Sequence, residues 1–204
     1  MDFDVITTSV KKAFDTFVQN IVAYIVGFLI AIIGSIFIIT IAPLFYGLYY
    51  MAIKGTRGEK VEIKDILYGF SSLGTFIRSW IGFIVYGILV YIISIIINVI
   101  VVLGISIAPS VMGVLSIVSM IITFIIEILL FFTLYIYVMT PSESIIYAIK
   151  ESFGISKSNI IMVILTMIVS FILSILIVTI PLGMVFAAYV LKELKPGIKD
   201  ASGI

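Results

Sequence analysis

The sequence predicts an all-α fold, a polytopic bundle of transmembrane helices with amphipathic helices lying in the membrane interface. The 204 residues are 63% hydrophobic and only 11% charged, with a mean hydropathy of +1.37, far from the balance of a soluble domain. Two apolar runs, 80–105 and 111–139, each exceed the roughly 20 residues that cross a bilayer. Both runs are apolar on every face, whereas the strands of a membrane barrel alternate. We therefore expect one helical transmembrane domain over 1–204.

The composition also excludes several kinds of chemistry. The chain has no cysteine and no histidine, so it lacks a thiolate nucleophile, a disulfide framework and the commonest nitrogen ligand for metals. We expect no catalytic residue, no metal site and no cofactor. The net charge is +1 and no basic patch stands apart from the apolar runs, so we expect no nucleic-acid partner. The expected partners are membrane lipids and a membrane or cytoplasmic protein.

Residues 1–53 form the first half-unit. Apolar residues recur every three or four positions from Ile6 to Ile21, a pattern that predicts an amphipathic helix in the membrane interface. Residues 20–53 are then almost continuously apolar, with interruptions at 34–35 and at Pro43. The proline predicts a helix break near 40–43. These 34 residues are too long for one crossing and slightly short for two.

A cytoplasmic connector (54–79) and a central hairpin (80–139) follow. The connector begins as a turn, and its apolar spacing from Ile63 to Phe76 predicts a second surface helix. The hairpin consists of the two long apolar runs joined at 106–110.

Residues 140–194 form the second half-unit, and 195–204 form a short polar tail. Thr140-Pro141-Ser142-Glu143 matches a capping box with proline at the first helical position, so we expect a helix to begin there. A last apolar block runs over 159–194, with a second predicted helix break at Pro181.

The two half-units share an order of parts. Asn159 follows Asn20 by 139 positions and Pro181 follows Pro43 by 138. Each unit reads as an amphipathic helix, an asparagine, about twenty apolar residues, Pro-Leu, a shorter apolar arm and a lysine. A duplication and two similar solutions to one packing problem both explain this order.

The positive charges favour one topology. The twelve Lys and Arg residues lie at 11–12, 54–64, 78, 150–157 and 192–199, and none lies in 105–110. Six crossings place all twelve on the cytoplasmic side with both termini, whereas four crossings place seven outside. The positive-inside bias favours six crossings, which predicts a multi-pass protein of the cell membrane with both termini cytoplasmic.

Glu127 is the single ionisable residue inside the two long runs. Polar residues on its own helix and on the preceding run complete a candidate intramembrane polar site: Glu127, Thr123, Ser119, Ser116, Asn98 and Ser94. One interpretation is a pathway for protons or cations. The other is a cluster of interhelical hydrogen bonds that holds the bundle together.

The stretch 43–54 (PLFYGLYYMAIK), then Arg57-Gly58-Glu59 and Gly69-Phe70, resembles a broad group of uncharacterised bacterial and archaeal integral membrane proteins. Residues 148–153 and 181–183 are similar to the second half of those proteins. The resemblance implies a six-span layout and a family of unknown function. We expect a non-enzymatic membrane module that binds a partner protein or a lipid; the alternative is a small transporter or channel for protons or cations that uses Glu127.

Overall fold

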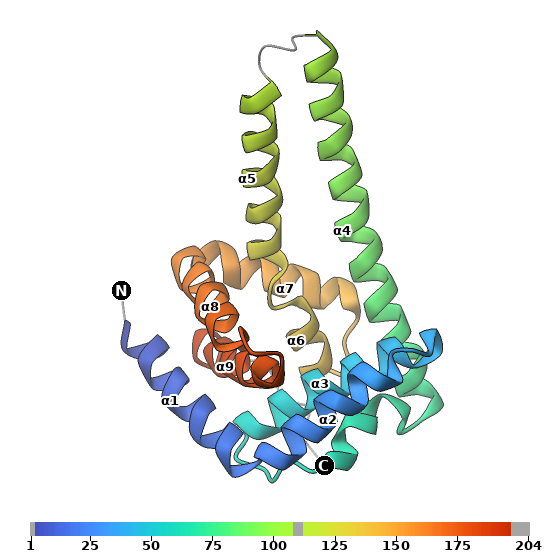
Figure 1. The fold of residues 1–204 in the computed structure, drawn as a ribbon, viewed down its shortest axis with the longest axis vertical. Helices are drawn as coiled ribbons and strands as arrows, with labels where there is room; N and C mark the ends of the chain where they lie inside the picture. Colours follow the sequence, from blue (N-terminus) through green and yellow to red (C-terminus); the bar gives the residue numbers. More distant parts are fainter. Residues whose placement is uncertain (1–2, 108–111, 197–204) are drawn as a thin grey trace.

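The computed structural model describes residues 3–107 and 112–196, and these residues form helices and turns without a strand. The all-α prediction is confirmed. The elements in chain order (Figure 1) are α1 (Phe3–Gln19), α2 (Ile21–Gly34), α3 (Ile38–Thr56), the 3-10 helix η1 (Ile63–Phe70), α4 (Leu73–Ile107), α5 (Met112–Leu130), α6 (Thr133–Met139), α7 (Ile145–Ser158), α8 (Ile160–Leu173), the 3-10 turn η3 (Ile177–Thr179) and α9 (Ile180–Leu194).

A long hairpin projects from a base formed by the other helices (Figure 1). Its first helix, α4, has 35 residues, about 52 Å at 1.5 Å per residue. In the most apolar stretch of α4 only 6% of the residues are buried, and in that of α5 and α6 together only 11%. The corresponding share in α3 is 56%. The hairpin therefore presents most of its apolar surface outward, as a lipid-facing element does.

Both half-units begin with the same bent pair of helices. The angle between α1 and α2 is 84°, and that between α7 and α8 is 103°. An asparagine occupies each bend, and its side-chain nitrogen donates to the carbonyl four residues earlier, from Asn20 to Thr16 and from Asn159 to Ile155, each at 3.0 Å. The order of parts shared by the two sequences is thus accompanied by the same local geometry.

Each bent pair continues into a short antiparallel hairpin. A Cβ added at Gly34 would meet Leu44, and one added at Gly27 would meet Met51, so α3 runs back along α2. In the second unit the Ser170 hydroxyl donates to the Gly183 carbonyl at 3.3 Å. The first arm of each hairpin has 14 residues, about 21 Å. By length and composition four described helices can cross a membrane, or up to six if each bent pair counts as one span.

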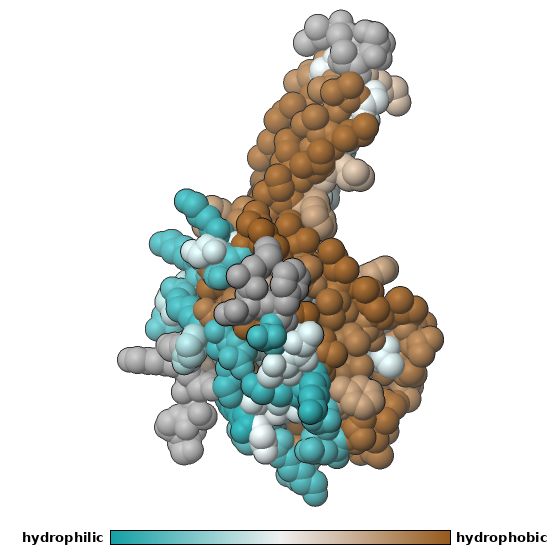
Figure 2. All heavy atoms as spheres, turned by 90° about the vertical axis from the view of Figure 1, so that its left-hand side faces the viewer, coloured by the Kyte–Doolittle hydropathy of each residue, from teal (hydrophilic) through white to brown (hydrophobic). Residues whose placement is uncertain are grey.

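The charged ends of the helices meet on one face of the base. Lys12 on α1 forms an ion pair with Glu193 on α9 at 2.9 Å, and Lys192 donates to the Thr56 carbonyl at the end of α3, 3.1 Å away. Figure 2 shows the hydrophilic residues gathered on one side of the base, while hydrophobic residues cover the other side and the hairpin. In a four-crossing layout a whole bilayer would separate Thr56 from Lys192.

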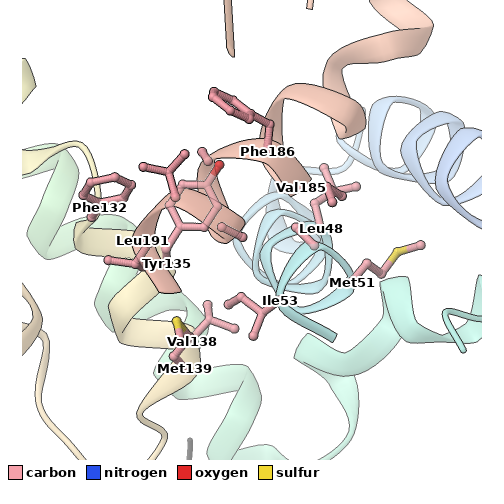
Figure 3. Packing of buried hydrophobic residues seen from close by; sticks show 14 of the residues in the cluster. Leu48, Met51, Ile53, Phe132, Tyr135, Val138, Met139, Val185, Phe186 and Leu191 are labelled. Carbon is pink, nitrogen blue, oxygen red and sulfur yellow. The ribbon is translucent and has the colours of Figure 1, made fainter. Parts of the chain in front are cut away.

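The core lies where α3, α6 and α9 meet (Figure 3). Met51 and Ile53 of α3, Ile136 of α6 and Phe186 and Leu191 of α9 are at most 2% exposed. These buried side chains fix the charged ends of the two half-units against the base of the projecting hairpin.

The break expected at Pro43 comes earlier in the chain. Pro43 lies inside α3 and is buried, and the helices separate at 35–37 instead. The Ser35 hydroxyl donates to the Ala31 carbonyl at 2.6 Å and that of Thr40 to the Phe37 carbonyl at 2.7 Å, which closes the turn. Pro43 stands near the start of α3, so its missing amide removes one of the first helical bonds rather than one in mid-helix. Pro181, in contrast, stands in the first turn of α9, just after the break.

Two other local expectations differ from the structure in their bounds. Thr140 ends α6, where its hydroxyl donates to the Ile136 carbonyl at 2.8 Å, and α7 begins only after Ser144, whose hydroxyl accepts from the Tyr147 amide. The surface helix expected from Ile63 to Phe76 is present only as η1 over Ile63–Phe70, and α4 already begins at Leu73. The Ser72 hydroxyl accepts from the Thr75 amide at 3.0 Å and caps the start of α4.

Candidate functional site

Glu127 lies on α5 one turn before the helix ends, and its side chain is exposed. No residue within 3–107 or 112–196 forms a hydrogen bond or ion pair with its carboxyl group. Tyr86 on α4 is close enough to interact with it electrostatically. The acid therefore faces out of the protein, at the level where the hairpin leaves the base.

Three of the other predicted polar residues bond to their own helices. The Ser94 hydroxyl donates to the Val90 carbonyl at 2.9 Å, the Asn98 amide to the Ser94 carbonyl at 2.7 Å, and the Ser116 hydroxyl to the Met112 carbonyl at 2.9 Å. In the described part of the hairpin no hydrogen bond joins the polar residues of α4 to those of α5. These side chains thus do not clamp the two helices together.

On α4 the polar residues lie beside the contact with α5. Ile97 is 7% exposed within the hairpin and marks the face turned to α5. At about 100° per residue, Ser94 and Asn98 lie roughly 60° and 100° to one side of Ile97. Asn98 is exposed and Ser94 is half-buried.

On α5 the polar residues turn to the same side of the hairpin. Ser119 and Thr123 are half-buried, and we take Ser119 as the reference for the face turned to α4. Ser116 and Glu127 are exposed and lie around the helix axis at roughly 60° and 80° from Ser119. Because α4 and α5 are antiparallel, these offsets and those on α4 point to one common side. We call this the polar side of the hairpin, made of Ser94, Asn98, Ser116, Ser119, Thr123 and Glu127.

Two glycines leave space on the polar side. Gly87 and Gly113 are exposed, lie roughly 80° and 120° from the contact faces in the same sense, and a Cβ added at either would meet nothing within 4 Å. Gly104, by comparison, faces Leu115 within the hairpin. Small residues with open space beside them allow another helix to approach closely.

A buried serine holds the point where the hairpin joins the base. The helix is interrupted between α5 and α6 by a turn at Phe131-Phe132. The Ser152 hydroxyl on α7 donates to the Leu129 carbonyl at 2.9 Å and accepts from the Phe132 amide at 3.2 Å. Ser152 is fully buried, so it satisfies two backbone groups that the break leaves without helical partners.

Arg78, which the sequence analysis did not single out, joins α4 to the segment between α6 and α7. Its guanidinium donates to the carbonyls of Tyr137 and Glu143, both at 2.7 Å, and of Thr140 at 2.8 Å. It also lies 3.8 Å from the centre of the Tyr137 ring. The available signal was a single arginine placed just before the apolar run 80–105.

A second buried charge fixes η1 against α3. The Asp65 carboxylate accepts from the Lys54 ammonium at 2.8 Å and from the Glu62 amide at 2.7 Å. Asp65 is only 8% exposed. Beside this pair the rings of Tyr50 and Tyr68 stack with their centres 3.7 Å apart. The tyrosines of this region therefore fill helix contacts.

The comparisons add no family. No protein-family model, no curated protein and no solved structure matches the sequence. The long apolar helices themselves show a multi-pass helical membrane protein. Among the described residues no three acidic side chains come together in a group that could hold a metal ion.

Proposed function

We propose that the protein is a non-enzymatic membrane module that binds a transmembrane helix of another protein along the polar side of its projecting hairpin. The supporting observation is Glu127, a carboxyl group exposed on a lipid-facing helix without a hydrogen-bond partner in the described chain. An acidic side chain left facing lipid costs free energy, up to about 2.5 to 3.5 kcal/mol when it lies at the helix centre. A helix that hydrogen-bonds Glu127 recovers part of this free energy, and an acyl chain does not.

The surroundings of Glu127 favour a helix as the ligand. Asn98 is exposed on the same side, so a partner helix meets an amide as well as an acid. Gly87 and Gly113 leave room for close backbone approach, the feature that stabilises helix pairs in lipid.

In this proposal the base sits at the cytoplasmic surface of the cell membrane with both termini on that side. The contacts of Lys12 with Glu193 and of Lys192 with Thr56 bring charged residues of α1 and α9 and the end of α3 together on one face, and the positive-inside bias favours the cytoplasm for that face. The short hairpins α2–α3 and α8–α9 then enter the membrane from that face as short, tilted or partly re-entrant arms, since a hydrophobic mismatch costs only a fraction of a kcal/mol per Å.

Photo-crosslinking in native membranes tests the proposal. A photoreactive residue at Met120, which is 66% exposed next to the polar side, should form a discrete adduct with a membrane protein. Val118, 44% exposed on the opposite side, is the matched control and should label lipid only. Glu127→Leu should abolish the Met120 adduct. Equal adducts from both positions, or an adduct that survives Glu127→Leu, would contradict the proposal.

The exposed Glu127 carboxyl also supports the second candidate, a carrier of protons or cations. A carrier must transport protons or cations when it is the sole protein in the membrane. In proteoliposomes the docking proposal predicts no flux above that of empty vesicles. Proton or cation flux that disappears in Glu127→Gln would favour the carrier.

A further inference from the structure

We propose that a groove at the bend between α1 and α2 binds the phosphate group of a membrane phospholipid. Two cavities of about 340 Å³ each adjoin there and share Gln19, Asn20 and Lys60 in their walls. They lie between the bent helix pair and the segment 55–63, close to the charged face of the base. This site is separate from the polar side of the hairpin.

The groove changes from polar to apolar along its length. Thr16, Gly58 and Glu59 line one cavity, whereas Val22 and Ile63 line the other. Val22 is 63% exposed and Ile63 is 39% exposed. A ligand that fills both parts has a polar head and an apolar chain, which is the chemistry of a phospholipid at the membrane interface.

Asn20 builds the groove by joining its two walls. Its side-chain oxygen accepts from the Val61 amide at 3.0 Å, while its side-chain nitrogen donates to the Thr16 carbonyl of α1. At the bend between α7 and α8, the Asn159 side-chain nitrogen likewise donates to the Ile155 carbonyl. No described backbone amide donates to the Asn159 side-chain oxygen. The groove therefore belongs to the first half-unit.

Lys60 is the cation available to a ligand in this groove. The Glu59 carboxylate lies 3.9 Å from Arg57 and that of Glu62 lies 2.6 Å from Lys64, whose ammonium lowers the pKa of Glu62. The acids of the groove thus have their own cations. Lys60 is exposed and has no ion pair or hydrogen bond with any described residue, so its ammonium is free to bind a phosphate oxygen.

The test measures binding of phosphatidylglycerol to the purified full chain in neutral detergent by native mass spectrometry. Lys60→Gln should lower the affinity at least fivefold, because it removes the charge-assisted bond. Lys11→Gln, an exposed lysine of α1, should leave the affinity unchanged. Equal weakening by both substitutions, or no effect of Lys60→Gln, would overturn the site.

A second pair of variants tests the apolar part. Val22→Trp fills the groove from an exposed position and should weaken lipid binding. Ile161→Trp, at the equivalent place after Asn159 and 50% exposed, should not. Inorganic phosphate at millimolar concentration should not displace the lipid. Displacement by phosphate, with equal affinity of wild type and Val22→Trp, would assign the groove to a free anion and overturn the lipid proposal.

Discussion

Removing the Arg78 guanidinium should separate the start of α4 from the segment between α6 and α7. Arg78 donates to three backbone carbonyls at 2.7 to 2.8 Å, and a hydrogen bond to a charged group contributes about 1.5 to 3 kcal/mol. The contact with Glu143 is exposed, so water replaces it in part. We expect Arg78→Ala to lower the free energy of unfolding by about 3 to 5 kcal/mol.

Thermal unfolding in detergent measures this effect. For a chain of this size each kcal/mol lowers the midpoint by about 2 to 4 °C, so the midpoint should fall by about 10 °C. Arg78→Lys keeps the charge but not the planar fork and should lose about half as much. Lys150→Ala, which removes an exposed cation of α7, is the control and should change stability by less than about 0.5 kcal/mol. A midpoint for Arg78→Ala within 1 °C of wild type would refute the role assigned to Arg78.

Three further substitutions, one of them with a matched control, test the packing of the base. Ser152→Ala leaves the Phe132 amide without its buried acceptor and should cost about 1 to 3 kcal/mol in detergent unfolding; a neutral result would show that the break needs no side-chain bond. Gly47→Ala drives a Cβ into the Ile66 carbonyl and should destabilise the protein, whereas Gly154→Ala, with open space around it, should be neutral or slightly stabilising. Asp65→Asn weakens its bond to partly buried Lys54 and should increase protease cleavage within 57–63, measured by limited proteolysis; unchanged cleavage would contradict the anchoring role.

The sequence predicted the features that depend on hydropathy. The length of 80–105 and its lack of charge require a lipid-facing helix, and α4 spans it. Asn20 and Asn159, which the sequence places between an amphipathic and an apolar stretch, coincide with the two bends, although the predicted helix breaks were at Pro43 and Pro181. Such features depend on local composition, which a single sequence displays directly.

Features that depend on tertiary contacts were missed or misplaced. The capping box at Thr140 has the right residues, yet Arg78 from α4 binds the Thr140 carbonyl, and the segment becomes a turn. The sequence gives no sign of that contact, because 62 positions separate the two residues. Sequence spacing suggested which residues share the helix of Glu127, but the side of the hairpin they occupy follows from the pairing of α4 with α5.

The most direct test of the account asks whether the charged connectors share one side of the membrane. Single cysteines placed at Lys11, Lys60 and Lys157, all exposed, should react with an impermeant thiol reagent from the same side in sealed vesicles. Cysteines at Ile36 and Ile175, the apolar tips of the short hairpins at 76% and 66% exposure, should react slowly from either side, because the tips lie in hydrocarbon. Labelling of Lys60→Cys from the side opposite to Lys11→Cys would contradict the account.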